Sequence, residues 1–309
     1  MQIGFGIPVS GSWATPANIV EISRAAERLG YSTLWSFQRT VYPADMSIPP
    51  PYRSVHDPLA ISAYVAAVTE RIRIGIAIVN LPFYAPIVLA KTLTSIDLLS
   101  QGRLDAGLGL GWNADEFAAA GVPMERRGAR AEDFVVCLRA IWTQEQVEHH
   151  GEFYDVPRGY VDPKPAQRPH PPILLGANAE SAMRRVGRIA DGWISSSRFE
   201  AAKVPGAVET IRSAAAEAGR DPSSIRIVIR GSVKVRDTDA ETPLSGTLDK
   251  IRRDVAAYAE AGATELFVDL NFDEQIGNPD ADPAASMRRA HEALEAFAPR
   301  HRAAFAPGH

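Results

Sequence analysis

The sequence predicts an α/β protein in which residues 1–309 form a single (β/α)8 barrel domain. Three observations support this: short β-branched runs alternate with helix-period segments along the whole chain, the strand–helix units number eight, and the strands are continuously apolar. Continuously apolar strands are typical of a parallel sheet that is covered on both faces. Because periodicity alone does not show that a sheet closes, a doubly wound open sheet is the alternative.

The first four units carry recognisable helix boundaries. Thr15-Pro16 and Asp57-Pro58 each supply an N-cap and a first-turn proline, and Gly30 is placed to end the first helix. The predicted strands are 3–9, 33–36, 72–79 and 104–108, and the inward helical positions are Ile19, Ile22, Ala26 and Leu29, then Ile61, Val65 and Val68, then Leu89, Leu93, Ile96 and Leu99.

The second half of the chain repeats this pattern four times. Its predicted strands are 173–175, 192–194, 225–229 and 265–269. The inward helical positions are Met183, Val186 and Ile189, then Val208, Ile211 and Ala215, then Ile251, Val255 and Tyr258, then Met287, Ala290, Leu294 and Phe297. Together with the first four, these units complete the count of eight.

Three connections are too long to be simple links. Segments 38–56, 109–172 and 231–246 follow the second, fourth and seventh strands, which places them at the carboxyl face where barrel enzymes build their active sites. The middle insertion should contain one helix, with Phe134, Leu138 and Ile141 inward, and a hairpin at 147–154. Surface insertions without function are the alternative, but we expect at least two of the three to wall a ligand site.

Composition excludes several classes of partner. With 33 Lys and Arg against 37 Asp and Glu, the net charge is -4, and no long run of like charge occurs, so neither nucleic acid nor a membrane surface is an expected partner. No apolar run approaches the ~20 residues that span a bilayer. The single cysteine, Cys137, and an N-terminal sequence unlike a signal peptide predict a cytoplasmic protein.

The chain offers few reactive groups of its own. Its seven histidines lack the spacing of a metal-binding motif, so no metal is expected, and there is no G-x-S-x-G elbow. The glycines of 107–111 do not have the G-x-G-x-x-G spacing of a dinucleotide loop. Segment 173–181 runs from a strand through a small turn into a helix, and Gly176, Ala177 and Ser181 could bind an anion there, although these residues alone slightly favour an ordinary βα turn. A cofactor that performs the chemistry on a small-molecule substrate is therefore the favoured interpretation.

Several longer stretches carry a family resemblance. They are RIRIGIAIVNLP at 71–82, APIVLAKTLTSIDLLSQGRL at 85–104, GLGLGW at 107–112 with Glu116 and Phe117, HHGEFY at 149–154, PKPAQ at 163–167 and ADGW at 190–193. In this order they resemble the bacterial luciferase-like monooxygenase family, over most of residues 1–270. Within it, the chain is most similar to the oxidoreductases assigned to the deazaflavin coenzyme F420 rather than to flavin mononucleotide (FMN).

The resemblance implies a homodimeric TIM-type barrel that binds a flavin-like ring at the carboxyl ends of its strands. It implies a non-prolyl cis peptide between Ala77 and Ile78 against one face of the ring, with Asn80 nearby. It also places Leu110 and Gly111 at the cofactor, and the cofactor phosphate at Gly176, Ala177 and Ser181.

Two departures from the family pattern bear on catalysis. Relatives can carry an arginine or glutamate where this chain has Leu110 and Trp112, which argues against the sugar-phosphate dehydrogenase branch. Many relatives have a Trp-x-x-Asp-His sequence after the second strand, where this chain reads WSFQR at 35–39. Arg39 could stabilise negative charge but is a poor general acid, and His56 could replace the missing histidine, unless it is only a solvated residue beside the Asp57 cap.

The favoured function is hydride transfer between F420 and a small organic substrate in an apolar pocket. The residues expected to form this pocket are Trp35, Phe37, Tyr42 and Trp112. An FMN-dependent monooxygenase supplied by a separate reductase is the alternative, and a non-catalytic flavin-binding protein is a third hypothesis from another class.

Overall fold

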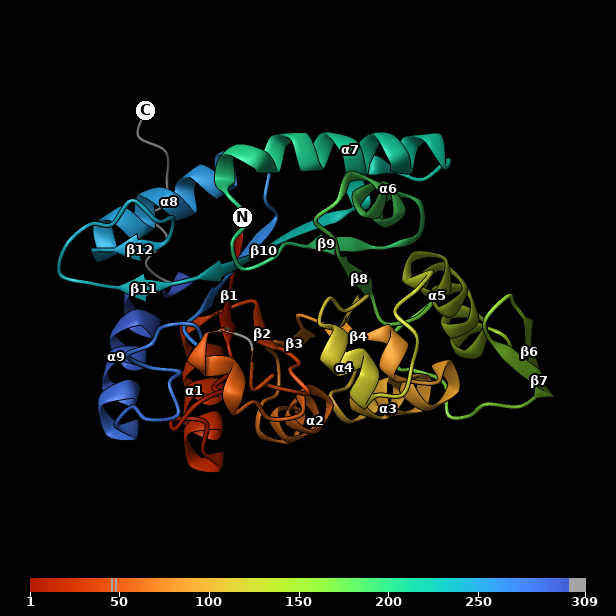
Figure 1. Cartoon of the computed structure of the whole chain (residues 1–309), viewed down its shortest axis with the longest axis horizontal. Coiled ribbons are helices and arrows are strands. Elements are labelled where there is room, and N and C mark those ends of the chain that lie inside the picture. Colours follow the sequence, from red (N-terminus) through yellow and green to blue (C-terminus); the bar gives the residue numbers. More distant parts are fainter. Residues whose placement is uncertain (46, 48, 300–309) are drawn as a thin grey trace.

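Eight parallel strands close into a barrel in the computed structural model, which describes residues 1–45, 47 and 49–299 (Figure 1). Around the barrel the order is β1, β2, β3, β5, β8, β9, β10 and β13, and β13 pairs with β1. The pairs Ile74↔Leu104 and Gly75↔Asp105 join β3 to β5 and complete the ring. The predicted TIM barrel is confirmed, and the open-sheet alternative is wrong.

Each barrel strand is followed by a helix that packs outside it. The strands are β1 (Gln2–Gly6), β2 (Thr33–Ser36), β3 (Arg73–Ile76), β5 (Leu104–Gly109), β8 (Ile173–Gly176), β9 (Gly192–Ile194), β10 (Arg226–Ser232) and β13 (Glu265–Asp269). The helices, in the same order, are α1 (Pro16–Leu29), α2 (Pro58–Val68), α3 (Pro86–Leu99), α5 (Arg127–Thr143), α6 (Glu180–Ile189), α7 (Val204–Glu217), α8 (Leu248–Glu260) and α9 (Pro283–Ala296).

The remaining elements lie in the connections. They are β4 (Val79–Asn80), α4 (Ala114–Ala119), the hairpin of β6 (Val147–His150) and β7 (Asp155–Gly159), the pair β11 (Lys234–Val235) and β12 (Ser245–Gly246), and the 3-10 turns η1 (Pro50–Arg53), η2 (Leu81–Phe83), η3 (Ala201–Lys203) and η4 (Pro222–Ser224). In the described part of the chain, no helix combines the length and the apolar character needed to cross a membrane.

The helices begin where the sequence indicates. The Thr15 hydroxyl accepts a hydrogen bond from the Asn18 N–H at 3.2 Å, and the Asp57 carboxylate caps α2 in the same way. Gly30 ends α1 with a φ of 85°, a conformation that glycine adopts without steric cost. The predicted starts of both helices and the predicted end of α1 are therefore confirmed.

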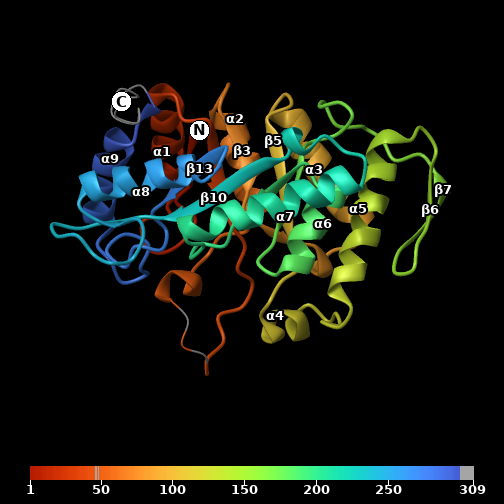
Figure 2. The ribbon, with the colours of Figure 1, turned by 90° about the horizontal axis from the view of Figure 1, so that it is seen from above.

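Most predicted strands agree with the structure to within three residues at either end, but two predicted elements differ in kind. The strand expected at 72–79 is divided, because β3 ends at Ile76 and β4 begins only at Val79, after the cis peptide between Ala77 and Ile78. The insertion after β5 contains two helices, α4 and α5, rather than one. The hairpin within it is confirmed and extends to Gly159. In both views it stands at the opposite end of the molecule from α1 and α9 (Figures 1 and 2).

Two apolar clusters form the core. The larger one lies between the strands and the helices. The smaller one fills the barrel interior with Trp35, Ala77, Leu174, Ile194, Val228 and Phe267, and the rings of Trp35 and Phe267 stack at 5.2 Å. Since the interior is filled by side chains, a ligand has room only above it, at the strand ends.

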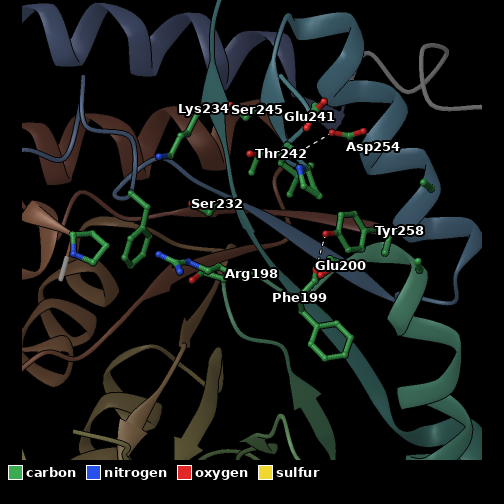
Figure 3. A pocket seen from close by; sticks show the side chains of 18 of the residues that line it. Arg198, Phe199, Glu200, Ser232, Lys234, Glu241, Thr242, Ser245, Asp254 and Tyr258 are labelled. Carbon is green, nitrogen blue, oxygen red and sulfur yellow. Dashed lines mark hydrogen bonds between the residues drawn. The ribbon is translucent and has the colours of Figure 1, made fainter. Parts of the chain in front are cut away.

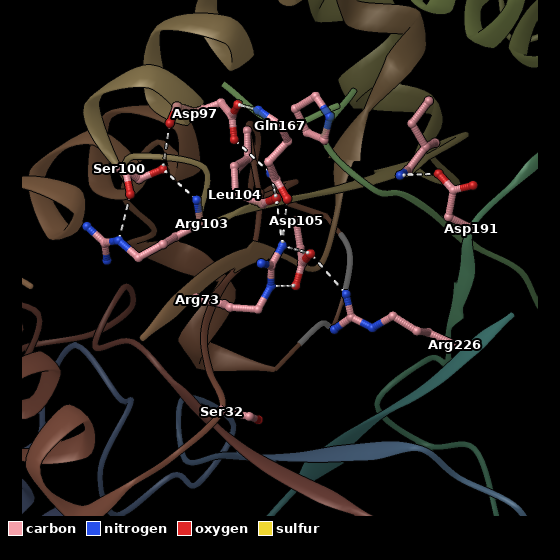
Figure 4. Close-up of polar contacts among 12 residues, drawn as sticks. Ser32, Arg73, Asp97, Ser100, Arg103, Leu104, Asp105, Gln167, Asp191 and Arg226 are labelled. Atoms are coloured by element: carbon pink, nitrogen blue, oxygen red, sulfur yellow. Dashed lines mark hydrogen bonds and ion pairs between the residues drawn. The ribbon is translucent and has the colours of Figure 1, made fainter. Parts of the chain in front are cut away.

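Charged side chains close the amino-terminal end of the barrel (Figure 4). Asp105 is fully buried and pairs with Arg73 at 2.5 Å and with Arg226 at 2.9 Å. Arg226 also pairs with Glu265, which accepts a hydrogen bond from the Trp35 indole. Both buried carboxylates thus have cationic partners, so this end serves the fold rather than a ligand.

Candidate functional site

A cavity of about 1070 Å³ opens at the carboxyl end of the barrel (Figure 3). Its wall comes from α8 and from the segments that follow β2, β5, β9, β10 and β13. Tyr52, Trp112 and Lys234 represent the three long insertions, all of which therefore contribute to one cavity. In Figure 2, α4 and the segment around η1 project from the same side of the barrel.

Aromatic side chains form one part of the cavity wall. Tyr52 and Phe272 line the cavity, with ring centroids 5.0 Å apart, and Phe37 packs against both from behind. Phe37 is only 3% exposed, so it supports the wall rather than forming its surface. Trp112 is 54% exposed and faces the same cavity.

Arg230 is a nearly buried cation beneath this aromatic wall. Its guanidinium lies 4.5 Å from the Phe37 ring centroid and 4.6 Å from that of Phe272. Its Nε donates to the Asp269 carboxylate at 2.9 Å, and its Nη1 donates to the Ala77 carbonyl oxygen at 3.2 Å. The arginine therefore joins the cavity wall to the cis peptide at the end of β3.

The bulge expected at Ala77 and Ile78 is present, and its peptide bond is cis as predicted. The Ile78 side chain lies over glycines of the next two strands: an ideal Cβ on Gly109 would come within 2.1 Å of Ile78 Cδ1, and one on Gly176 within 3.5 Å of Ile78 Cγ2. The Ile78 side chain can therefore occupy this position because Gly109 has no side chain.

Asn80 and Gly111 lie together beside this bulge. Asn80 is 6% exposed, and its Cγ lies 3.6 Å from the position that a Cβ on Gly111 would take. Its backbone N–H donates to the Gln38 side chain at 2.9 Å. Gly111 has a φ of 72°, and Leu110 before it is partly buried. The structure therefore brings Ile78, Asn80, Gly111 and Gly176 to neighbouring strand ends.

The turn after β8, which is expected to bind the cofactor phosphate, is fixed by a hydrogen bond from Trp193. The Trp193 indole donates to the Ala177 carbonyl at 2.9 Å, which fixes the turn after β8. Ser181 is exposed on the first turn of α6, and this helix begins without a side-chain cap. Its first N–H groups can therefore face an anion.

Arg39 anchors the segment after β2. Its guanidinium pairs with the Glu116 carboxylate at 2.7 Å, and the two side chains are only 5% and 1% exposed. Glu116 also accepts the Thr40 N–H at 2.7 Å. The Arg39 guanidinium lies 4.5 Å from the Tyr52 ring centroid and 5.0 Å from that of Trp112. Its charge is therefore neutralised, and it supports two cavity residues from behind.

His56 lies outside the cavity wall among the described residues. It is exposed, and its Nε2 lies 2.9 Å from the Ala14 carbonyl, while its backbone N–H donates to Val9. These contacts join the segment after β2 to the segment after β1. The structure thus gives His56 a local structural contact next to the Asp57 cap.

The other two expected pocket residues do not line the cavity either. Trp35 is 1% exposed inside the barrel, where its indole donates to Glu265 at 2.9 Å. The Trp35 side chain points into the barrel from β2, so it belongs to the core rather than to the cavity wall. Tyr42 is partly buried and is not among the described residues of the cavity wall.

Cys137 is completely buried in α5, as the sequence predicts for a thiol in a helical stripe. Burial raises the pKa of this thiol to about 11. The protonated form therefore dominates at neutral pH, and the thiol is not a nucleophile there.

Three residues of the site, Arg230, Asp269 and Arg198, were not predicted from the sequence. One signal for Arg230 was present: Arg226, Val228 and Arg230 alternate in a strand, and Val228 belongs to the barrel interior, so the two arginines share its inward face. Arg198 gave no such signal because it lies in an irregular segment after β9.

Comparisons with known proteins agree with this architecture. The model of the luciferase-like monooxygenase family matches residues 3–243. An uncharacterised protein of Mycobacterium tuberculosis is 33% identical over 284 residues, which cover 86% of this chain and 99% of that protein. The FMNH2-dependent dimethylsulfone monooxygenase of Pseudomonas putida is 32% identical over 226 residues, or 72% of this chain and 59% of that protein. An F420-dependent secondary alcohol dehydrogenase in complex with an F420–acetone adduct has a similar solved structure, with a TM-score of 0.77, 14% identity and 99% of both chains covered. This chain therefore belongs to the luciferase-like monooxygenase family.

Proposed function

We propose that this protein is an oxidoreductase that uses coenzyme F420 to transfer a hydride to or from a small organic substrate. The observation that carries the proposal is the Ala77–Ile78 bulge, whose carbonyl is held by Arg230 next to a large aromatic cavity. Chemistry in this family centres on a flavin-like ring, and such a ring could lie against the backbone of the bulge beside the Ile78 side chain.

The residues around the bulge fit the proposed cofactor. Ala77 has a small side chain and Gly176 has none, so a planar ring could approach these two strand ends closely. Asn80 would lie at the edge of the ring. The phosphate would lie against Gly176, Ala177 and Ser181, where the uncapped start of α6 offers N–H donors.

The protein's part in the reaction is binding and orientation. When bound, F420 supplies the hydride chemistry. Arg230 fixes the carbonyl of Ala77 and so sets the shape of the ring-binding surface. Tyr52, Trp112 and Phe272 offer apolar surface that holds the substrate and keeps water away from it.

A second candidate is a monooxygenase that uses reduced FMN supplied by a separate reductase. The observation that favours it is the 32% identity with a protein whose name specifies FMNH2 and dimethylsulfone. The same ring-binding surface and phosphate turn would serve either cofactor, because both need a flat slot and an anion site.

Parallel fluorescence titrations of the purified protein with F420 and FMN test the proposal. We expect F420 to bind at micromolar concentration and more tightly than FMN.

Gly176→Val should weaken cofactor binding, because it places a branched side chain on the phosphate turn. Gly206→Val on α7 has open space around it and should leave cofactor binding unchanged. Preference for FMN would favour the monooxygenase, and tight binding without turnover on a broad substrate panel would favour a non-catalytic flavin-binding protein. Binding of neither cofactor would overturn all three.

We also propose that the protein is a homodimer. Nine large hydrophobic side chains in the described ranges are exposed, and six of them lie on α2, α3 and α5: Tyr64, Ile87, Val88, Leu98, Leu99 and Val136. These three helices are neighbours, since α3 contacts both of the others. An apolar face of this kind suits a self-complementary interface. A cytoplasmic location stays a prediction from the sequence.

A further inference from the structure

The cavity contains a cation that no described residue pairs with. Arg198, in the segment after β9, lines the cavity and is exposed to it. Within residues 1–45, 47 and 49–299 it has neither an ion pair nor a side-chain hydrogen bond. The other cation of the wall, Lys234, is already bound to Glu274 at 2.5 Å. Arg198 is therefore the cation that remains available for an anion.

The carboxylates of the wall do not neutralise Arg198. Glu200 pairs with Lys203 at 2.8 Å, and Asp254 pairs with Lys250 at 2.7 Å. Glu241 lies at the side of the cavity next to α8, apart from the Arg198 guanidinium (Figure 3). None of the four described carboxylates that line the cavity, Glu200, Glu241, Asp254 and Glu274, therefore pairs with Arg198.

The backbone that carries Arg198 is fixed on both sides. The Tyr258 hydroxyl donates to the Phe199 carbonyl at 2.6 Å, and the Phe199 ring packs edge-on against Trp193 at 4.9 Å. Burial raises the pKa of Tyr258 to about 12, so its hydroxyl remains a donor at neutral pH. On the other side, the Ser195 N–H donates to the Val228 carbonyl at 2.9 Å. The backbone at Arg198 therefore needs little further ordering when the guanidinium binds a ligand.

We propose that Arg198 binds an acidic group of the substrate, so that the substrates are small organic acids with an apolar or aromatic body. The planar guanidinium matches the two oxygens of a carboxylate or a related oxyanion. The body of the substrate would pack against Tyr52, Trp112 and Phe272, which share the cavity with Arg198. This assignment names the substrate class of the proposed oxidoreductase. The reaction of the acid rests on that proposed function, whereas the binding of the acid to Arg198 does not.

Matched pairs of acids and amides test the proposal by calorimetry on the full-length protein, with and without cofactor. The probes are benzoate with benzamide and 2-naphthoate with 2-naphthamide, which differ in charge but hardly in shape. We expect each acid to bind at least about tenfold more tightly than its amide. Arg198→Met should remove this preference, and Arg198→Lys should retain part of it. As a control, Arg289→Met on the outer helix α9, at an exposed arginine outside the cavity wall, should behave as the wild type.

Three results would overturn the proposal: no acid binds at millimolar concentration, acids and amides bind equally, or Arg198→Met binds acids as the wild type does. A fourth comparison identifies the source of the acidic group. If Arg198→Met weakens the binding of FMN but not of riboflavin, Arg198 holds the cofactor phosphate and the substrate assignment is wrong. If acids bind through Arg198 while neither F420 nor FMN binds, the proposed function fails but this inference stands.

Discussion

At the scale of single residues, the buried pair of Arg39 and Glu116 connects two of the long insertions. Arg39 follows β2 and Glu116 lies in α4, and both are almost fully buried. A buried ion pair contributes little net stability compared with apolar residues, but the loss of one partner leaves an uncompensated charge. The pair therefore determines how the two insertions sit over the barrel more than how stable the barrel is.

Glu116→Gln should destabilise the protein by about 3 kcal/mol, because Arg39 then remains buried without a countercharge. Urea unfolding measures the change. The control is Glu152→Gln, which removes a pair with Arg126 in which both side chains are more than half exposed, and it should cost less than about 1 kcal/mol. Equal losses in the two variants would contradict the structural role assigned to Arg39.

Arg230 combines two functions that a pair of variants can separate. Arg230→Met leaves Asp269 buried without its cation and the Ala77 carbonyl without its donor, so we expect lower stability and weaker cofactor binding. The double variant Arg230→Met/Asp269→Asn removes the unpaired charge and should regain stability, but not cofactor affinity. Urea unfolding and cofactor titration follow the two effects, and recovery of both together would show that the contact with Ala77 is unimportant.

At the scale of elements, two glycines of β5 should respond differently to substitution. A Cβ on Gly107 would lie 1.7 Å from the Ile76 carbonyl oxygen, which belongs to the backbone of a neighbouring strand and cannot move alone. A Cβ on Gly109 would meet only the side chain of Ile78. Gly107→Ala should therefore destabilise the fold, whereas Gly109→Ala should mainly displace Ile78 and weaken cofactor binding.

Removing the obstructing side chain tests this difference. Gly109→Ala/Ile78→Ala relieves the contact and should bind the cofactor more tightly than Gly109→Ala alone, while Ile78→Ala gives the baseline for the lost isoleucine. Thermal unfolding and cofactor titration are the measurements. If Gly109→Ala destabilises the protein as strongly as Gly107→Ala does, the close approach to Ile78 is a packing requirement of the fold.

The barrel could be predicted from the sequence because each unit has its own local signal. Thr15, Asp57 and Gly30 act through hydrogen bonds and backbone angles that depend only on near neighbours, and the apolar strands show that the sheet is buried on both sides. Closure of the barrel depends on the pairing of β3 with β5, which is not a local property. The prediction of closure therefore required the count of strand–helix units and the family resemblance.

The site could be predicted only in part, because its contacts join distant segments. The bulge at Ala77 and the turn at Gly176 belong to recognisable stretches, and the structure places them at neighbouring strand ends. The pairing of Arg39 with Glu116 spans 77 residues, and that of Arg230 with Ala77 spans 153 residues. No periodicity reports such contacts, which is why Arg39 was assigned to catalysis and Arg230 was missed.

At the scale of the whole molecule, the apolar face on α2, α3 and α5 bears on the oligomeric state. Leu99, Val88 and Val136 are 65%, 58% and 54% exposed in the single chain, which is unusual for large aliphatic side chains gathered on neighbouring helices. No described residue of α2, α3 or α5 lines the cavity, so this face and the cavity do not share residues. A second copy could cover the face and leave the cavity open.

The double variant Val88→Glu/Leu99→Glu tests this arrangement. Two carboxylates on the apolar face would have to be buried without partners in a dimer, so we expect the variant to sediment as a monomer where the wild type sediments as a dimer. Tyr160→Glu is the control, because Tyr160 is also 65% exposed but lies after β7 rather than on one of the three helices. Cofactor binding by the monomeric variant should remain unchanged, since no residue of this face lines the cavity. A wild-type monomer at micromolar concentration, or a double variant that still dimerises, would exclude this face as the interface.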